Sequence, residues 1–408
     1  MTSSSFAALG LGAVQLRALD ALGFTIPTPI QTQTIPALLA GKDVLGVAQT
    51  GSGKTAAFGL PLLHQLEAAP FRAQPQTTAA LILAPTRELA MQIEEHIRAL
   101  GAGQRLRITP IMGGCSRSAQ VRRMRPGVDL VIGTPGRICD LLSSNELKLH
   151  QVRYFVLDEA DRMLDLGFIR DIRRIVAALP AQRQSTLFSA TMPREVAQLA
   201  EGLLRDPTRV SIAPVAATAP KIDQHVHFVP TAAKRALLGH LLDDPQMERV
   251  IVFTRTKHGA DRVAEALETG GVSVSALHGN KSQPQRVRAL DAFRSGRARV
   301  LVATDIAARG IDVTGVSHVI NYDLPMQAED YVHRIGRTAR AGASGTAISF
   351  CDPAERGTLR AIERMTGTAI SVAGGEQMAA NDAIPQRKAP SAPNGVRRRR
   401  RGPMRRAA

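Results

Sequence analysis

The chain has 408 residues, of which 44% are hydrophobic and 3% aromatic with no Trp, so two or three domains with aliphatic cores can form. A formal net charge of +17 suits a polyanionic partner, either nucleic acid or an anionic membrane surface. No apolar run approaches the ~18 residues of a membrane span, and the N-terminus lacks the features of a signal peptide. Three isolated cysteines favour a reducing compartment, and we expect a cytoplasmic protein.

Short apolar runs alternate with helical patterns over residues 1–210, the expected first domain. The expected strands are residues 43–48, 79–84, 129–134, 154–159 and 185–190. A helical pattern lies between several of them, for example over residues 86–100. The alternation predicts an α/β domain with a mostly parallel sheet that is covered on both faces.

The stretch 211–224 is rich in Ala and Pro and has no clear period, so we interpret it as a linker. The same alternation resumes over residues 225–370, which we expect to form a second, similar domain. Its expected strands are residues 249–253, 272–277, 299–304, 318–323 and 345–350. The sequence therefore predicts two α/β domains in tandem.

Residues 371–408 are rich in Pro and Arg and low in apolar residues, which predicts a disordered basic tail. Residues 381–408 carry nine Lys or Arg and one Asp, a net +8 that leaves +9 for the rest of the chain. We expect the tail to act as an electrostatic tether for nucleic acid. The alternative is a tail that serves only solubility.

The sequence AQTGSGKT, from Ala48 to Thr55, follows the first expected strand and fits the spacing of a P-loop. Gly51 and Gly53 allow the backbone N–H groups to turn toward phosphate oxygens, and Lys54 reaches the β- and γ-phosphates. Thr55 offers a hydroxyl to Mg²⁺. The alternative is a Gly-rich turn that merely contains a Lys, but the full eight-residue pattern favours a nucleotide site.

Three carboxylates follow the apolar run at 154–157, at Asp158, Glu159 and Asp161. In a P-loop protein a carboxylate at the end of a neighbouring strand holds Mg²⁺, and Asp158 is placed for that role. Glu159 is then placed to position the water that attacks the γ-phosphate. The alternative is a solvated acidic turn at a helix N-terminus.

These motifs resemble those of the DEAD-box RNA helicases, and the resemblance covers roughly residues 1–370. The matching segments are GFTIPTPIQ (23–31), PTRELA (85–90), TPGR (134–137), DEAD (158–161), SAT (189–191), VIVFTRT (250–256), ATDIAARGID (303–312) and HRIGRTAR (333–340). The resemblance implies two RecA-like domains, an ATP hydrolase and RNA helicase activity, ATP and Mg²⁺ as cofactors, and RNA as the partner. The segment HGNKSQ (278–283) and the Arg-rich tail are similar to the bacterial RhlE-type subgroup, whereas Ala339 stands where many members carry Gly.

The resemblance also assigns roles to individual residues. The nucleotide contacts are Phe6, Phe24, Gln31, Gln49, Thr50, Gly51, Ser52, Gly53, Lys54, Thr55 and Asp312, with Thr55 and Asp158 at the metal. The RNA contacts are Pro85, Thr86, Arg87, Gly113, Gly114, Thr134, Arg137, Gln283, Arg286, Thr304 and Asp305. Ser189, Ala190 and Thr191 couple ATP to strand separation, and His333 links the ATP site to them.

The second expected domain has no P-loop of its own but carries Arg337 and Arg340 three residues apart. They are placed to act as arginine fingers on the γ-phosphate across an interdomain cleft. Catalysis would then depend on closure of the two domains, and RNA bound across both would favour the closed form. The alternative is a solvated basic helix face.

The low aromatic content argues against base stacking and predicts contacts to phosphates and 2′-hydroxyls with weak sequence preference. Ribosome-assembly or mRNA-decay proteins are possible partners by family analogy. Two other functions stay open. One is an RNA annealing protein that depends on the basic tail, and the other is a DNA helicase or translocase of the same superfamily.

Overall fold

The computed structural model describes residues 5–48, 51–69, 73–212, 222–308, 313, 315–339 and 344–374. Gln49, Thr50, Asp312, Arg340 and residues 375–408, for which we made predictions above, lie outside this part of the chain. No helix within it is long and apolar enough to cross a bilayer.

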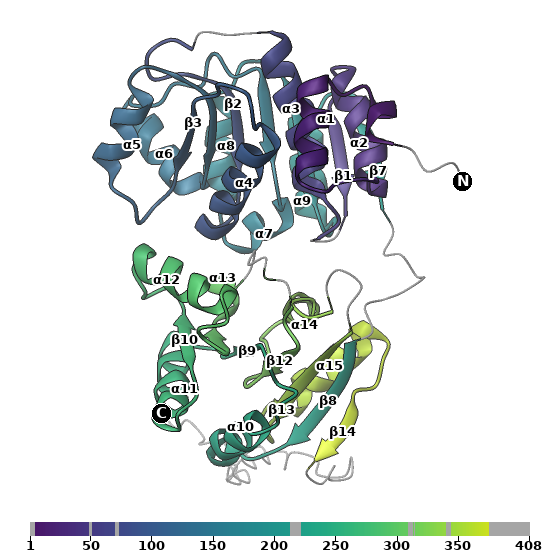
Figure 1. The fold of residues 1–408 in the computed structure, drawn as a ribbon, viewed down its shortest axis with the longest axis vertical. Coiled ribbons are helices and arrows are strands. Elements are labelled where there is room, and N and C mark those ends of the chain that lie inside the picture. The colour runs from purple at the N-terminus through teal and green to yellow at the C-terminus, as the bar shows by residue number, and fades with distance from the viewer. Residues whose placement is uncertain are drawn as a thin grey trace, which may run out of the picture.

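The first domain contains a seven-stranded parallel sheet in the order β3-β4-β2-β5-β6-β1-β7 (Figure 1). The strands are β1 Val44–Val47, β2 Thr78–Leu83, β3 Ile108–Ile111, β4 Val128–Gly133, β5 Tyr154–Leu157, β6 Gln184–Ser189 and β7 Thr208–Ser211. The helices are η1 Phe6–Leu9, α1 Ala13–Ala21, α2 Pro29–Leu39, α3 Lys54–Ala68, α4 Arg87–Leu100, α5 Arg117–Met124, α6 Pro135–Ser143, α7 Ala160–Asp165, α8 Ile169–Ala177 and α9 Arg194–Leu203.

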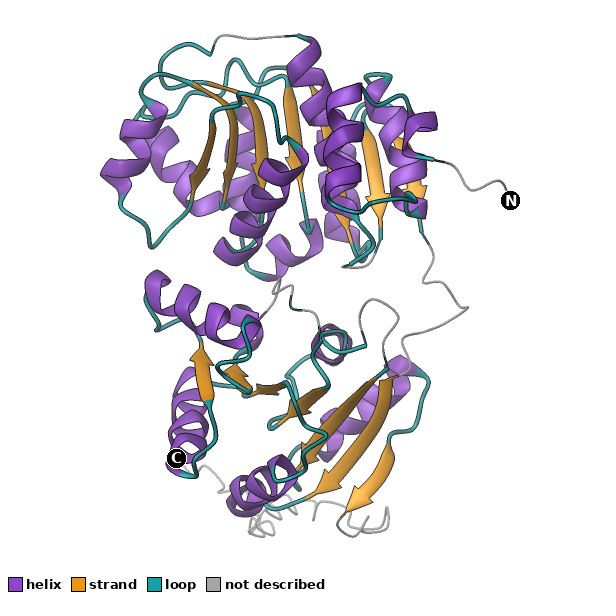
Figure 2. Ribbon diagram, in the orientation of Figure 1, coloured by secondary structure: helices purple, strands orange, loops and turns teal. Residues whose placement is uncertain are grey.

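Both faces of this sheet are buried, which explains why its central strands β2 and β5 are almost entirely apolar. All six residues of β2 are buried, because alternate side chains point to opposite faces and each face carries helices. Ala80 and Ile82 pack in a core with α2, α3 and α4, whereas Leu81 and Leu83 pack in a second core with α6, α8 and α9. The helices on the two faces of the sheet are visible in Figure 2.

The second domain repeats this architecture, with a parallel sheet in the order β10-β11-β9-β12-β13-β8-β14. The strands are β8 Ile222–Phe228, β9 Val250–Phe253, β10 Val274–Leu277, β11 Val300–Ala303, β12 His318–Asn321, β13 Gly345–Cys351 and β14 Ser371–Gly374. The helices are η2 Thr231–Ala233, α10 Lys234–Leu242, α11 Lys257–Thr269, α12 Gln283–Arg294, α13 Asp305–Ala308, α14 Ala328–Ile335 and α15 Arg356–Thr366.

Two predicted boundaries need correction. Ser211 belongs to β7, and Ile222–Gln224 belong to β8 and pair with β13, so structured residues occupy both ends of the expected linker at 211–224. Residues 371–374, which we assigned to the disordered tail, form β14 and pair with β8. The prediction failed because β7 and β14 are edge strands with mostly exposed side chains, and β8 interleaves Asp, Gln and His with its apolar residues.

Candidate nucleotide and nucleic-acid site

The glycines of the P-loop adopt backbone conformations that other residues disfavour. Gly51 and Gly53 have φ values of 86° and 91°, in the left-handed region. Gly53 caps the 15-residue helix α3, so the backbone turns directly into a helix N-terminus, where N–H groups and the helix dipole favour anions. Lys54, the first residue of α3, is buried and donates a hydrogen bond from Nζ to Ala48 O at 3.0 Å.

Gln31, an expected nucleotide contact, and Thr28 of the same matching segment hold the P-loop in this structure. Gln31 Nε2 donates to Gly53 O at 3.1 Å, and Thr28 Oγ1 donates to Ser52 O at 2.9 Å. Gln31 Oε1 also accepts from Thr28 N at 2.9 Å, in the capping box that starts α2. A side chain at Gly53 would collide with Gln31, because its Cβ would lie 2.5 Å from Nε2.

A pocket of about 400 Å³ adjoins the P-loop. Its lining includes Leu22, Phe24, Gln31, Gly51, Gly53, Lys54, Thr55, Asp158 and Glu159. Phe24 is 45% exposed, a suitable state for a side chain that is to contact a ligand. Phe6 lies elsewhere, buried in the core with Leu9 and Leu38, and its role as a nucleotide contact stays a prediction.

Asp158 and Glu159 follow β5 and are both buried. Burial raises the pKa of Asp158 to about 6, although Lys54 opposes this shift. Burial also acts to raise the pKa of Glu159, but Arg162, Lys54 and Arg337 outweigh it, and this pKa lies below its ordinary value. The Glu159 carboxylate is therefore held ionised, with Oε2 accepting from Arg162 Nη1 at 2.7 Å.

Glu159 has an unusual backbone conformation at the start of α7. Its φ and ψ are both 55°, the left-handed region that costs a non-glycine residue roughly 1–2 kcal/mol. The Asp158 carboxylate accepts a hydrogen bond from Glu159 N at 3.0 Å, which stabilises this sharp turn. The turn projects both carboxylates into the pocket beside Lys54.

Asp161, to which the sequence analysis gave no role of its own, binds the SAT segment. Its Oδ2 accepts from Ala190 N at 3.1 Å, Thr191 N at 2.8 Å and Thr191 Oγ1 at 2.9 Å. Asp161 N also donates to Ser189 Oγ at 3.2 Å. The end of β6 and the start of α7 are thus joined by a single buried carboxylate.

Residues of both domains line a second pocket of about 540 Å³. Its lining contains Glu159, Asp161, Arg162, Ala190 and Thr191 from the first domain and Asp330, His333 and Arg337 from the second. Arg337 is buried and donates from Nε to His333 O at 3.2 Å. Glu159 lines both pockets, so it separates the P-loop from the expected arginine finger.

The structure gathers the expected RNA contacts of the first domain at the carboxyl edge of its sheet. Thr86 caps α4, and Arg87 packs so closely on the loop after β3 that a Cβ at Gly114 would lie 2.1 Å from Arg87 Nη1. Arg137 Nη1 donates to Cys115 O at 3.3 Å in the same loop. Arg87, Gly114 and Arg137, which are far apart in sequence, therefore lie together.

The expected RNA contacts of the second domain have partners that sequence reasoning missed. Arg286 Nε donates to Glu88 Oε1 at 2.8 Å across the domain boundary, and Gln283 Nε2 lies 3.4 Å from the same oxygen. Glu88 lies within the PTRELA motif, but nothing in the sequence pairs it with a residue 198 positions away. Thr304, which follows β11, is partly buried.

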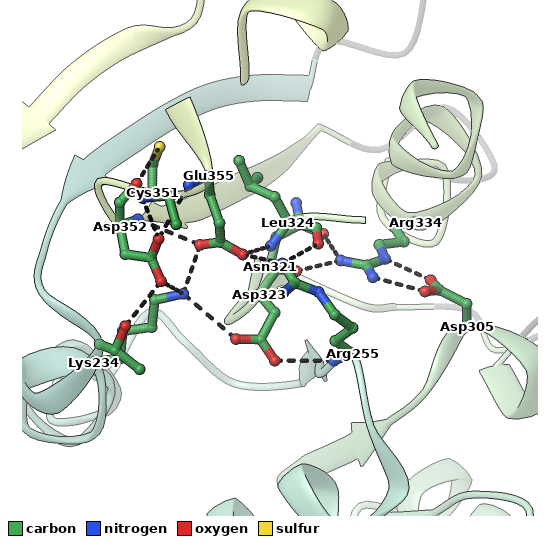
Figure 3. A network of polar contacts seen from close by, with 12 residues as sticks. Lys234, Arg255, Asp305, Asn321, Asp323, Leu324, Arg334, Cys351, Asp352 and Glu355 are labelled. Carbon is green, nitrogen blue, oxygen red and sulfur yellow. Dashed lines mark hydrogen bonds and ion pairs between the residues drawn. The ribbon is translucent and has the colours of Figure 1, made fainter. Parts of the chain in front are cut away.

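Asp305 belongs to a buried polar network in the second domain (Figure 3). Arg334 Nε and Nη2 donate to its two carboxylate oxygens at 2.5 and 2.7 Å, and Arg334 Nη1 donates to Asp323 O at 2.6 Å. Asp323 in turn lies 3.4 Å from Lys234 Nζ. The network fixes Arg334, three residues before Arg337, and so holds the end of α14 in place.

Ala339 adopts a φ of 54°, again in the left-handed region. This observation gives a physical reason for Gly at this position, because a Cβ is disfavoured there. The described residues contain no cluster of three His, Cys, Asp or Glu side chains that could hold a metal by themselves. A P-loop Mg²⁺ site does not need one, because phosphates and water supply most of its ligands.

Comparisons with known proteins agree with this geometry. Residues 28–199 match the DEAD/DEAH box helicase family, and residues 233–342 match the helicase conserved C-terminal domain. The DEAD-box ATP-dependent RNA helicase CshA of Geobacillus kaustophilus is 45% identical over 363 residues, which cover 89% of this chain and 77% of that protein. The chain belongs to the DEAD-box ATP-dependent RNA helicases.

Other members of the family support the same assignment. The Bacillus subtilis CshA is 43% identical over 89% of this chain and 72% of its own. The structure of S. cerevisiae Dbp5 bound to RNA and ADP BeF3 aligns with a TM-score of 0.80 at 34% identity, over 91% of this chain and 95% of that one. The structure of Mss116p bound to ssRNA and AMP-PNP aligns with a TM-score of 0.81 at 29% identity, over 92% and 80%. The predicted pair of RecA-like domains is confirmed.

Proposed function

We propose that this DEAD-box helicase hydrolyses ATP only when its two domains close on RNA, and that closure locally separates short duplexes. The observation that carries this proposal is the shared pocket in which Glu159 of the first domain meets Arg337 of the second. Arg162 and Lys54 lower the pKa of the Glu159 carboxyl against the effect of burial, and the charge of Arg337 adds to this lowering. An open enzyme would retain Lys54, Asp158 and Glu159 but would lack the arginine.

The roles of the site residues follow from their positions. Lys54 and the P-loop N–H groups bind the phosphates, and Glu159 orients the attacking water. Arg337 stabilises the charge that develops on the γ-phosphate, and Arg340 is the second candidate for this role.

Thr55 and Asp158 would hold Mg²⁺, and their surroundings fit such an ion. The burial that raises the pKa of Asp158 to about 6 shows that an ionised carboxylate is costly there, and a dication would relieve that cost. When bound, Mg²⁺ would neutralise charge on the β- and γ-phosphates. The protein's part is to place a buried carboxylate opposite Lys54.

Asp161 couples the nucleotide site to strand separation. Its three hydrogen bonds tie the SAT segment to the helix that follows Glu159, so movement at one element is transmitted to the other. His333 lines the pocket beside Asp161 and Thr191, which supports its proposed link to this segment. ATP-driven closure would thus reach residues 189–191 through a continuous set of polar contacts.

RNA would bind across both domains by its backbone. Arg87, Arg137 and Arg286 supply cationic contacts, and the N–H groups of Gly113 and Gly114 supply neutral ones. The relatives Dbp5 and Mss116p are described as bound to RNA, and this chain aligns with them over both domains. We infer weak sequence preference, because the chain has few aromatic side chains on which bases could stack.

We further infer a cytoplasmic location. We also infer an RhlE-type subgroup, which the HGNKSQ segment and the Arg-rich tail support. The curated relatives described above carry the name CshA, and they support the family rather than this subgroup. Ribosome-assembly and mRNA-decay proteins are the partners we propose by analogy.

A Glu159→Gln variant tests the proposed function. The substitution preserves shape but removes the carboxylate, so ATP should still bind while multiple-turnover unwinding of a short RNA duplex is lost. Glu201→Gln, an exposed substitution on α9, is the matched control and should unwind normally. Unwinding by Glu159→Gln at the rate of the control would refute the proposal, and retained strand annealing alone would favour an annealing protein that uses the basic tail.

A further inference from the structure

Arg162 is a buried arginine that uses only a small part of its hydrogen-bonding capacity. It belongs to α7, three residues after Glu159, and 8% of its surface is exposed. Its Nη1 donates to Glu159 Oε2 at 2.7 Å. Its Nε and Nη2 are buried and have no hydrogen-bond partner among the described residues. Buried N–H groups without partners are destabilising, so the packing of α7 alone does not explain why an arginine stands here.

Arg334 in the second domain shows how a structural arginine of this chain is bonded. It is buried like Arg162, but all three of its guanidinium nitrogens donate. Their acceptors are oxygens of Asp305, Asn321 and Asp323. Arg162 has a single side-chain acceptor among the described residues, and that acceptor is the carboxylate to which we assign the attacking water. The contrast indicates that Arg162 serves Glu159 more than it serves the fold.

The contact with Arg162 makes the two carboxylate oxygens of Glu159 different. Oε2 accepts from Arg162, whereas no described residue donates a hydrogen bond to Oε1. Two other cations act on this carboxylate, but Lys54 Nζ and Arg337 Nε each donate to a backbone carbonyl instead. Among the described residues, Arg162 therefore provides the hydrogen bond that fixes the orientation of the carboxylate and leaves one oxygen available.

Arg162 approaches Glu159 from the side away from the P-loop. It lines the pocket that the two domains share, but it does not line the pocket beside Lys54, whereas Glu159 lines both. A carboxylate that is held from the interdomain side by one oxygen keeps its other oxygen for the side of the nucleotide. A carboxylate oxygen accepts a hydrogen bond from water, and the rate depends steeply on how well such a group is placed.

We propose that Arg162 is a positioning residue for ATP hydrolysis, which holds Glu159 by Oε2 so that Oε1 orients the attacking water. The inference rests on the proposed function, because it assumes that Glu159 orients this water. Arg162 contacts neither ATP nor the water in this role and acts through Glu159 alone. Its loss should therefore lower the maximal rate of hydrolysis and leave the binding of ATP and RNA unchanged.

Arg162→Met is the first test, because it keeps an unbranched side chain and removes every N–H donor. We expect the maximal rate of RNA-stimulated ATP hydrolysis to fall about ten- to a hundredfold, the cost of a misplaced reacting group. KM for ATP and the affinity for single-stranded RNA should change less than about twofold. Arg162→Lys keeps a charge and a donor and should recover part of the lost rate. Arg173→Met, an exposed substitution on α8, is the matched control and should hydrolyse ATP normally.

A double-mutant cycle with Glu159→Gln separates positioning from a structural role. If Arg162 acts only through Glu159, Arg162→Met should lower the single-turnover rate of Glu159→Gln by less than about twofold. A further fall as large as in the unsubstituted chain would overturn the inference, because Arg162 would then act by another route. Arg162→Lys is taken through the same cycle, so the result does not depend on whether Arg162→Met folds.

Two other outcomes would overturn the inference while the proposed function survives. One is a maximal rate for Arg162→Met equal to that of Arg173→Met, with Glu159→Gln still impaired. The other is a raised KM for ATP with an unchanged maximal rate, because Arg162 would then contribute to binding. A normal rate for Glu159→Gln itself would overturn the proposed function, and the same assays distinguish these results.

Discussion

The two domains place a lysine at the same point of the same topology and use it in opposite ways. In the first domain Lys54 begins the helix after β1. In the second domain Lys234 begins the helix that follows β8 and η2. The strands β1 and β8 occupy equivalent positions in their sheets. Lys54 bonds a backbone carbonyl and faces the pocket that holds Asp158. Lys234 is fully buried, with Glu355 at 2.7 Å and Asp323 at 3.4 Å (Figure 3).

The carboxylates near these lysines show the same contrast. Asp158 follows β5, and Asp323 lies two residues after β12, the equivalent strand. Asp323 accepts from Arg255 N at 2.9 Å, and Glu355 pairs with both Lys234 and Arg255. The second domain satisfies the charges of Lys234, Asp323 and Glu355 internally, whereas the first keeps Lys54 and Asp158 available for a ligand. A shared fold therefore does not imply a shared site.

Lys54→Ala should give the largest effect. Loss of the phosphate contact should lower ATP turnover by at least about 10³, because charge on the phosphates would be unbalanced in the transition state. The thermal unfolding midpoint should stay within a few degrees of the unsubstituted chain, since the Lys54 ammonium bonds the Ala48 carbonyl and forms no ion pair with a carboxylate in the described part of the chain. Retained turnover would remove the P-loop assignment.

Arg337→Ala should nearly match this loss of turnover without the loss of ATP binding. An arginine finger is worth roughly 10³–10⁵ in rate, and Arg337 is the described candidate from the second domain. Fluorescent-nucleotide titration and steady-state ATPase assays separate the two quantities. Weakened nucleotide binding with an unchanged maximal rate would contradict the finger role.

Lys234→Met should lower the free energy of unfolding instead of the rate of ATP hydrolysis. Removal of one partner from a buried ion pair costs about 3–5 kcal/mol, because Glu355 and Asp323 would be left uncompensated. Burial alone would lower the pKa of Lys234, but Glu355, Asp323 and Asp352 outweigh it and raise this pKa above its ordinary value. The stabilisation is therefore fully present below pH ~10.5, and it is lost as the pH rises through the raised pKa. Denaturant unfolding at neutral pH measures the cost, and an unchanged midpoint would show that the pair adds nothing.

Asp161→Asn should separate ATP hydrolysis from unwinding. An amide cannot reproduce the three charge-assisted bonds that the Asp161 carboxylate accepts, so duplex separation per ATP should fall about tenfold. Turnover should fall much less, because Asp161 does not line the pocket beside the P-loop. Equal losses in the two assays would mean that Asp161 only supports the fold.

The reactivity of the buried cysteines reports on the unfolding of each domain separately, and here we expect the smallest effect. Burial raises the pKa of Cys139 in the first domain to about 11 and that of Cys351 in the second to about 12, so both thiols are unreactive at pH 8. A thiol reagent should label Cys115, which is exposed, and reach Cys139 and Cys351 only on unfolding. In Lys234→Met, Cys351 should become reactive at lower denaturant than Cys139. Simultaneous labelling of the two would show that the domains unfold together.

The sequence predicted the elements and residues that have a local signature. Apolar runs identified β2, β5 and β9, because both faces of those strands are almost entirely buried. The strand β3 was missed: it is four residues long and contains Pro110. Motif spacing likewise pointed to Lys54, Asp158 and Glu159, which lie in two short contiguous motifs and line one pocket in the structure.

Several partners of the site residues could not be predicted, in two cases because they come from distant parts of the chain. Glu88 meets Arg286 across 198 positions, and Asp305 meets Arg334 across 29. Arg162 is only three residues from Glu159, but an arginine at that spacing on a helix is usually solvated. Its burial, which gives the pair its effect on the Glu159 pKa, appears only in the folded structure.

The most direct test of closure-dependent catalysis is steady-state ATPase activity without nucleic acid, with single-stranded RNA and with single-stranded DNA, each with ATP and with GTP. We predict strong stimulation by RNA only, and with ATP only, because RNA across both domains brings Arg337 to Glu159 and Gln31 selects adenine. Activity that is indifferent to RNA would contradict the account, because the domains would then close without their ligand. Equal stimulation by DNA would contradict the predicted contacts to 2′-hydroxyls.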